Sequence, residues 1–181
     1  MADLRILFSL WLDYSKSPKC GKRRTIMSMT IERYLAQHEI PYELMTHSHS
    51  ATSMQSARAA HVDPHRVAKA VLLEGSDGCY MSAVIPANRQ VSLGHLRHDY
   101  GQMFRLADER VIAPIFKDCE PGAIPALTTP YHLEMIWDDS LLNEPEIYFE
   151  AGDHEHLVHL RTEYLREMLD RLPHGRICEP V

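Results

Sequence analysis

Two apolar runs on either side of a short turn constrain the fold of this chain more than any other feature. The first run, VAKAVLLE, covers residues 67–74, and the second, CYMSAVIPA, covers residues 79–87. Between them lie the four residues GSDG, bracketed by Gly75 and Gly78. Apolar runs that flank a glycine-bracketed turn are typical of a β-hairpin. The sequence therefore predicts an antiparallel pair of strands near the middle of the chain.

Helical and strand patterns alternate along the rest of the chain. Apolar spacing and capping residues predict helices that begin near Thr30, Thr52, Ser92, Asp108 and Thr162. The fourth of these is expected to reach Phe116 with a bend at Pro114. Further strands are predicted at 42–47, 132–137, 146–152 and 156–160. Because the hairpin interrupts a regular βαβ alternation, the predicted fold class is mixed α+β.

The chain has 181 residues, of which 45% are hydrophobic, and this size fits one globular domain. Residues 1–26 show little periodicity and are interpreted as a poorly ordered N-terminal extension, which leaves residues 27–181 as the domain. No apolar run approaches the roughly 20 residues of a membrane-spanning helix. The N-terminus also lacks the pattern of a secretory signal, so we expect a cytoplasmic protein that does not enter a membrane.

The net charge of −6 is unevenly distributed. Residues 16–24 hold five of the nineteen lysines and arginines, and without residues 1–26 the chain has 13 basic and 23 acidic residues, a charge of −10. Such a body repels a phosphate backbone, so a broad basic face for nucleic acid is not expected. Any nucleic acid must be held locally or delivered by a partner.

Cysteine and histidine give weak signals for chemistry. The four cysteines are far apart and form no CxxC pair, so reduced thiols are expected, and Cys119 is not favoured as a nucleophile. His154 and His156 could meet one metal ion, but no third ligand stands at a recognisable spacing, so no metal site is predicted. Asp138, Asp139 and Glu150 are interpreted as solvated charges.

Lys69 is the one charge inside the run from Val67 to Leu73. In a strand it shares a face with Val67 and Val71, while Ala68 and Ala70 occupy the other face, so neither face is polar. An ammonium group there loses hydration, which lowers its pKa, unless it opens into a wet cavity. A helical or edge position would leave the same lysine solvated. The pattern alone leaves both interpretations open.

Four segments in order resemble the YbaK family, which contains the insertion domain of prolyl-tRNA synthetase and its free-standing relatives. These segments are TSMQSARAAHVDPHRVAKAVLLE, YMSAVIPA, FKDCEPGAIPAL and IYFEAGDHEHLVHL, and the resemblance covers about residues 29–172. It implies a mixed, barrel-like β-sheet surrounded by helices. It also implies a pocket for the aminoacyl group at the tRNA 3′ end.

The resemblance places Lys69 at the position of the family's key pocket lysine. It places the family's GxxxP loop on Gly122, Ala123, Ile124, Pro125 and Ala126, and it makes Gly152 and His154 further substrate contacts. The chain departs from the family at Ala126, where a proline is usual, and continues as ALTT. No cofactor is implied.

The activity implied by the resemblance is hydrolysis of mischarged aminoacyl-tRNA in trans, with alanine or cysteine on proline tRNA as familiar substrates. Such a pocket must hold the ester and stabilise the oxyanion formed when water attacks. The implied partners are the aminoacyl-tRNA 3′ end and prolyl-tRNA synthetase, and the oligomeric state is left open. The altered loop keeps a non-catalytic ligand-binding or regulatory domain as an alternative. A metal-dependent hydrolase using His154 and His156 is a more distant one.

The acidic body predicts weak, salt-sensitive tRNA binding that is helped by residues 16–24 or by a synthetase partner. Deleting residues 1–26 is expected to weaken tRNA binding, which a filter-binding titration at low salt measures. Unchanged affinity would show that the basic stretch makes no contribution.

Overall fold

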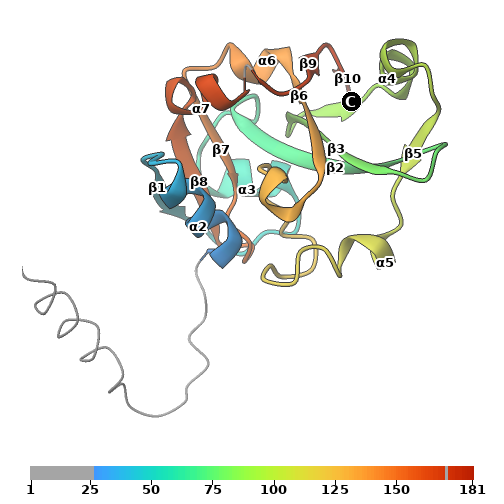
Figure 1. Cartoon of the computed structure of the whole chain (residues 1–181). Coiled ribbons are helices and arrows are strands. Elements are labelled where there is room, and N and C mark those ends of the chain that lie inside the picture. Colours follow the sequence, from blue (N-terminus) through green and yellow to red (C-terminus); the bar gives the residue numbers. More distant parts are fainter. Residues whose placement is uncertain (1–26, 170) are drawn as a thin grey trace, which may run out of the picture.

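Short helices alternate with strands in the computed structural model, which describes residues 27–169 and 171–181 (Figure 1). The predicted extension at residues 1–26 lies outside the described residues. The strands are β1 (Glu43–Thr46), β2 (Val67–Gly75), β3 (Tyr80–Pro86), β4 (Arg89–Val91), β5 (Phe104–Leu106), β6 (Glu134–Asp138), β7 (Glu146–Glu150), β8 (His156–Arg161), β9 (His174–Gly175) and β10 (Cys178–Pro180). The helices are α2 (Met29–Gln37), α3 (Ser53–Ala59), α4 (Leu93–Tyr100), α5 (Glu109–Ile112), α6 (Asp139–Leu142) and α7 (Thr162–Leu169), with a 3₁₀ turn η2 (Thr129–Tyr131). None of these described helices has the length and hydrophobicity to cross a bilayer.

One large sheet organises the fold. Its strand order is β1-β8-β7-β2-β3-β6-β9, with β5 paired to β2. The predicted hairpin is confirmed, since β2 and β3 pair antiparallel from Ala68 opposite Pro86 to Glu74 opposite Tyr80. β2 pairs parallel with β7, and β3 pairs parallel with β6, so the sheet is mixed. The predicted α+β class is therefore confirmed. Among the described residues, the end strands β1 and β9 do not pair with each other, so the sheet is not a closed barrel.

Helices α2 and α7 cover the main core. Ile31 and Leu35 of α2 and Leu165 of α7 are fully buried, and they belong to one cluster with Trp137 and Phe149 of the sheet. A second cluster lies under α4, where Leu96 packs with Ile85 and Ile177 among others. The predicted apolar faces are thus buried at Leu96 of α4 and at Leu165 and Leu169 of α7, whereas Leu93 and Tyr164 are exposed.

Several local predictions need correction. The helix expected from Asp108 to Phe116 covers only Glu109–Ile112, because a proline at position 114 cannot continue its hydrogen bonds. Helix α7 starts at Thr162 itself, whose buried hydroxyl has no hydrogen-bond partner, so Thr162 is no side-chain cap. Ser92 stands at the start of α4 but forms no cap bond.

The turn before α3 has the predicted capping arrangement with one change. The N–H of Gln55 donates to the hydroxyl of Thr52, as a capping box requires. The Gln55 side chain instead accepts from the N–H of Ala51, one residue before the cap. Both bonds satisfy donors that a helix start would otherwise leave free.

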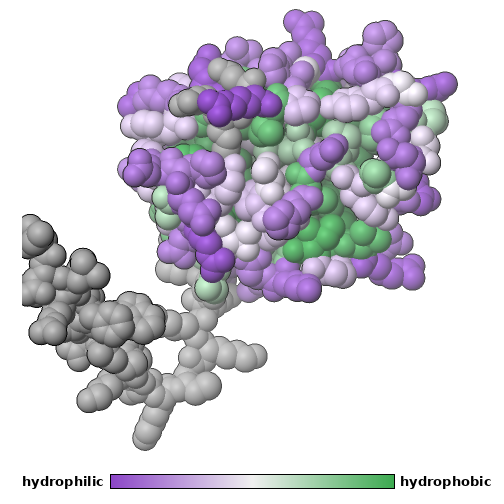
Figure 2. Space-filling view, in the orientation of Figure 1, coloured by the Kyte–Doolittle hydropathy of each residue, from purple (hydrophilic) through white to green (hydrophobic). Residues whose placement is uncertain are grey.

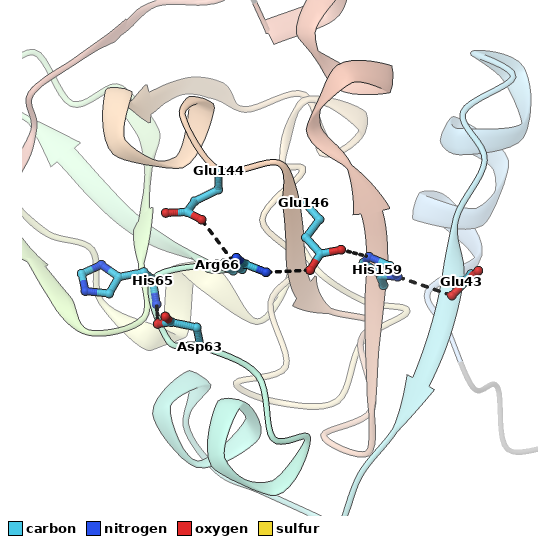
Figure 3. Close-up of polar contacts among 7 residues, drawn as sticks. All are labelled: Glu43, Asp63, His65, Arg66, Glu144, Glu146 and His159. Carbon is cyan, nitrogen blue, oxygen red and sulfur yellow. Dashed lines mark hydrogen bonds and ion pairs between the residues drawn. The ribbon is translucent and has the colours of Figure 1, made fainter.

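A polar chain crosses one end of the sheet (Figure 3). Arg66 donates to Glu144 at 3.2 Å and to Glu146 at 2.8 Å, and His159 lies 3.1 Å from Glu146 and 3.5 Å from Glu43. The ring of His159 also stacks on Tyr148 at 4.5 Å between centroids. These contacts connect β1, β8 and β7 to Arg66, which directly precedes β2.

Asp138 ties the C-terminal segment to the sheet. Its carboxylate accepts the N–H groups of Ser140, Ile177 and Cys178 at 2.9–3.1 Å, and its side chain is buried. Burial alone would raise the pKa of Asp138, but the hydrogen bonds outweigh this and lower it below 3.8. The interpretation of Asp138 as a solvated charge was therefore wrong.

Replacing this carboxylate is expected to destabilise the fold. Asp138→Asn should lower the free energy of unfolding by about 2 kcal/mol at pH 7, because bonds to a charged acceptor are lost. Since the folded pKa is depressed, the difference from wild type should be constant between about pH 5 and pH 7 and should shrink as the pH falls below 3.8. Urea denaturation across this range measures it, with the half-exposed neighbour Asp139→Asn as the control. An equal loss in both variants would contradict the role of Asp138.

Candidate functional site

Three segments far apart in the sequence meet at one end of the sheet. They are residues 47–50, the Gly122 loop (residues 119–126) and the AGDHEH turn (residues 151–156). The N–H of Glu120 donates to the carbonyl of Gly152 at 2.8 Å, and the N–H of Ser50 donates to the carbonyl of His154 at 3.1 Å. A further bond of 2.8 Å runs from the N–H of His47 to Glu155. Backbone bonds therefore hold the three segments together.

His154 lies at the centre of this group. Its backbone has a φ of 63°, a left-handed conformation that is uncommon for residues other than glycine and that recurs at functional sites. Nε2 lies 2.9 Å from the carbonyl oxygen of Pro121, so it must carry the proton and donate. In the neutral ring Nδ1 is then left as an acceptor. The His49 ring lies 5.3 Å away between centroids.

Two acidic side chains shape the turn that presents His154. The Glu150 carboxylate accepts the N–H of His154 at 3.0 Å and of Gly152 at 3.5 Å. The Asp153 carboxylate accepts from the N–H of Glu155 and His156 and lies 2.7 Å from the His156 ring. Burial raises the pKa of Glu150, and the bonds from the turn oppose this only in part.

Glu150 was wrongly interpreted as a solvated charge, although the sequence held a warning. It ends the strand EIYFE, in which Ile147, Tyr148 and Phe149 are all buried. A strand that is buried on both faces gives a terminal carboxylate little access to water. The missed signal was that Ile147, Tyr148 and Phe149 place apolar side chains on both faces of the strand.

The Gly122 loop combines a buried anchor with an open backbone. Ala123, Pro125 and Ala126 are buried, and Ala126 packs in the main core, so the position that departs from the family points inward. Gly122 has a φ of 90°, which a side chain would strain. A Cβ added there would also lie 3.6 Å from the His154 ring.

Two neighbouring backbone N–H groups of the loop differ in their hydrogen bonding. The N–H of Ala123 donates to the carbonyl of Glu120 at 2.9 Å, so it is already used. The N–H of Gly122 forms no hydrogen bond with any described residue. Of these two backbone donors, only the N–H of Gly122 can bind a ligand without breaking a bond.

A small apolar cavity of about 190 Å³ adjoins the loop. Its lining includes Ile112, Phe116, Gly122 and Ile124. Figure 2 shows hydrophobic surface gathered beside α5, the helix that ends at Ile112. The cavity has room for a small side chain or a few waters, well below the usual ligand pocket of roughly 300–1,000 Å³.

Lys69 is placed on β2, directly opposite Ile85 of β3. The side chain is half-buried, and its Nζ donates to the carbonyl of Ala87 at 3.0 Å. Desolvation lowers the pKa of Lys69, as expected for an ammonium on an apolar face, and the nearby Cys178 opposes this shift. Within the described residues, no hydrogen bond or ion pair joins Lys69 to the Gly122 loop, so their shared pocket stays a prediction.

Cys119 belongs to a buried polar group that anchors the loop to α2. Ser28 donates to Asp118 at 2.7 Å and lies 2.6 Å from the Tyr131 hydroxyl, which is 3.4 Å from the thiol. Burial raises the pKa of Cys119 to about 11, so the thiol is protonated at neutral pH. A protonated thiol is a poor nucleophile.

The histidines of the AGDHEH turn have separate partners. His154 faces Pro121, whereas His156 contacts Asp153. In the part of the chain that the structure describes, no group of three or more His, Cys, Asp or Glu side chains could hold a metal ion.

Comparison with known proteins decides the family. A sequence profile described as the aminoacyl-tRNA editing domain matches residues 47–168, more than half of the chain. The chain belongs to the aminoacyl-tRNA editing domain family. The matched region contains Lys69, the Gly122 loop and His154. No curated protein matches the chain.

Solved structures share the fold at low identity. The hypothetical protein APE2540 is 17% identical with a TM-score of 0.73, over 83% of this chain and 99% of that one. A candidate trans-editing enzyme for prolyl-tRNA synthetase is 18% identical with a TM-score of 0.67, over 84% and 96%. A candidate signal transduction protein from Marinobacter aquaeolei VT8 is 15% identical with a TM-score of 0.67, over 82% of this chain and 30% of that one.

The thiol environment predicts selective labelling. At pH 8, alkylation of Cys119 should be at least about 100-fold slower than that of the exposed Cys79, because only a minute fraction of Cys119 is thiolate. Peptide mapping by mass spectrometry after timed iodoacetamide treatment measures both rates. Comparable rates at the two residues would mean that Cys119 is accessible and ionised.

Proposed function

We propose that this protein hydrolyses aminoacyl-tRNA charged with the wrong small amino acid and acts in trans to the synthetase. The observation that carries the proposal is that one family match spans Lys69, the Gly122 loop and the AGDHEH turn. Alanyl or cysteinyl esters on proline tRNA are the proposed substrates, and prolyl-tRNA synthetase is the proposed partner. Because translation uses aminoacyl-tRNA in the cytoplasm, we place the activity there.

The size of the cavity beside the Gly122 loop supports a small amino acid. An alanyl or cysteinyl side chain fits about 190 Å³, and the apolar lining of Ile112, Phe116 and Ile124 suits a neutral group. A synthetase separates such similar side chains by only roughly 1–3 kcal/mol per methylene, so a second hydrolytic site is needed to remove errors.

The chemistry requires an oxyanion donor and a positive charge near the ester. The unpaired N–H of Gly122 supplies the donor, since a fixed backbone amide stabilises the tetrahedral oxyanion without reorganisation. Lys69 supplies the charge, and its partial burial strengthens its field. Binding of the ester would exchange the contact of Lys69 with Ala87 for one with the substrate.

His154 is proposed to orient the substrate. With Nε2–H held by Pro121, the free Nδ1 can accept a hydrogen bond from the substrate ammonium group. Glu150 and Asp153 act through His154 by holding its turn, and they are positioning residues. A substrate hydroxyl or thiol can assist water, which removes the need for a separate protein base.

Substitution of Lys69 tests the proposal. Lys69→Ala is expected to lower kcat/KM for alanyl- or cysteinyl-tRNA of proline by about 100-fold or more, because a charge that stabilises the transition state is lost. Release of the radiolabelled amino acid from the purified mischarged tRNA measures the rate. Lys117→Ala is the matched control, since this exposed lysine should leave the rate unchanged.

Two outcomes would contradict the proposal. If wild type hydrolyses no small aminoacyl-tRNA across a panel of tRNAs, the chain is a ligand-binding or regulatory domain on this scaffold. If a chelator abolishes hydrolysis while Lys69→Ala retains it, the chemistry depends on a metal and not on Lys69.

A further inference from the structure

A second, larger cavity of about 720 Å³ lies apart from the Gly122 loop. Its walls come from three stretches of the chain, at residues 89–95, 138–143 and 174–178. None of its lining residues belongs to the Gly122 loop or to the AGDHEH turn. Its volume is in the range of roughly 300–1,000 Å³ that is usual for ligand-binding pockets.

Two arginines bring positive charge to this cavity. Arg89 and Arg176 line it together with His95 and His174. Among the described residues, the side chains of Arg89, Arg176 and His95 form no hydrogen bond or ion pair. Two guanidinium groups without an acceptor therefore face one open volume.

The acidic residues of the same cavity are already partnered. The oxygens of Asp138 accept from the backbone N–H groups of Ser140, Ile177 and Cys178 and from the Ser140 hydroxyl. Asp139 lies 2.8 Å from the ring of His174. The carboxylates thus have donors, whereas the guanidinium groups lack acceptors.

The fold holds the two arginines in place. Strand β10 pairs with β4, with Cys178 opposite Val91 and Pro180 opposite Arg89. The two residues that follow Arg176 are both bonded to the buried Asp138. Arg89 and Arg176, which are far apart in the sequence, are therefore both held in the lining of one cavity.

The cavity lies next to Lys69. Nζ of Lys69 is bonded to the carbonyl of Ala87, two residues before Arg89. Cys178 lines the cavity and also acts on the pKa of Lys69. A ligand held by the arginines would therefore lie near Lys69.

From these observations we infer that the Arg89–Arg176 cavity binds phosphate groups of the tRNA acceptor end. The inference rests on the proposed function. Guanidinium groups match phosphate oxygens in pairs, and a protein body with a charge of −10 needs such a local grip on a polyanion. The terminal phosphates would be held here while Lys69 reaches the ester.

Binding of uncharged proline tRNA to the full-length protein tests the inference without any hydrolysis. Arg89→Gln/Arg176→Gln should weaken binding about tenfold at low salt and should reduce the slope of log K against log salt by about 1.4–1.8, the value for two lost phosphate contacts. Arg33→Gln/Arg58→Gln, a pair of exposed arginines with the same charge change, should alter both quantities little. Arg176→Gln alone, at an exposed position, should give about half the change in slope.

The remaining readouts separate this inference from the proposed function. If the protein hydrolyses mischarged tRNA, the double variant should raise KM with kcat nearly unchanged, whereas Lys69→Ala should lower kcat. If it hydrolyses none, the tRNA binding and its salt slope still test the cavity. The inference would be overturned if the double variant bound tRNA with the affinity and salt slope of the wild type. An equal loss of affinity in the Arg33/Arg58 control would also overturn it. So would pyrophosphate binding that is tighter than tRNA binding and is lost in the double variant.

Discussion

The antiparallel pairing of β2 with β3 is the interaction on which the rest of the structure depends. Both strands are interior to the sheet, because β2 also pairs with β7 and β5, and β3 with β6. The register places Lys69 opposite Ile85 and brings its ammonium to the carbonyl of Ala87 just beyond β3. A slip of one residue would turn Lys69 to the opposite face, since side chains alternate along a strand. The hairpin therefore decides where the ammonium group of Lys69 lies.

The buried Asp138 and Asp153 and the half-buried Glu150 organise the backbone where it leaves the sheet. Asp138 binds two N–H groups of the C-terminal segment, and Glu150 and Asp153 bind N–H groups of the AGDHEH turn. Burying a carboxylate costs free energy unless its lone pairs are used, and here irregular backbone supplies the donors. The same groups thus shape the wall of the Arg89–Arg176 cavity and the left-handed conformation of His154.

The arrangement suits a substrate that is both an ester and a polyanion. The Gly122 loop offers a small apolar cavity and one unpaired N–H group. Arg89 and Arg176 line a cavity beside the separate two-stranded β4–β10 sheet, and Lys69 bonds to Ala87 just before β4, in a chain whose body is otherwise acidic. Local positive charge in an acidic surround can limit binding to nucleic acid that enters in one orientation.

The sequence by itself determined the α+β class, the hairpin, most helix starts and the family resemblance, because these follow from local periodicity and ordered motifs. It also showed that Lys69 has no polar face. It did not show β4, β5, β9 or β10, which are only two or three residues long and exist because a neighbouring strand completes their hydrogen bonds. Nor did it show that Asp138 is buried, since its backbone partners Ile177 and Cys178 lie about 40 residues away. Only the tertiary structure brought Arg89 and Arg176 into the lining of one cavity and His154 against Pro121, because such arrangements depend on how strands distant in sequence are paired and not on any local pattern.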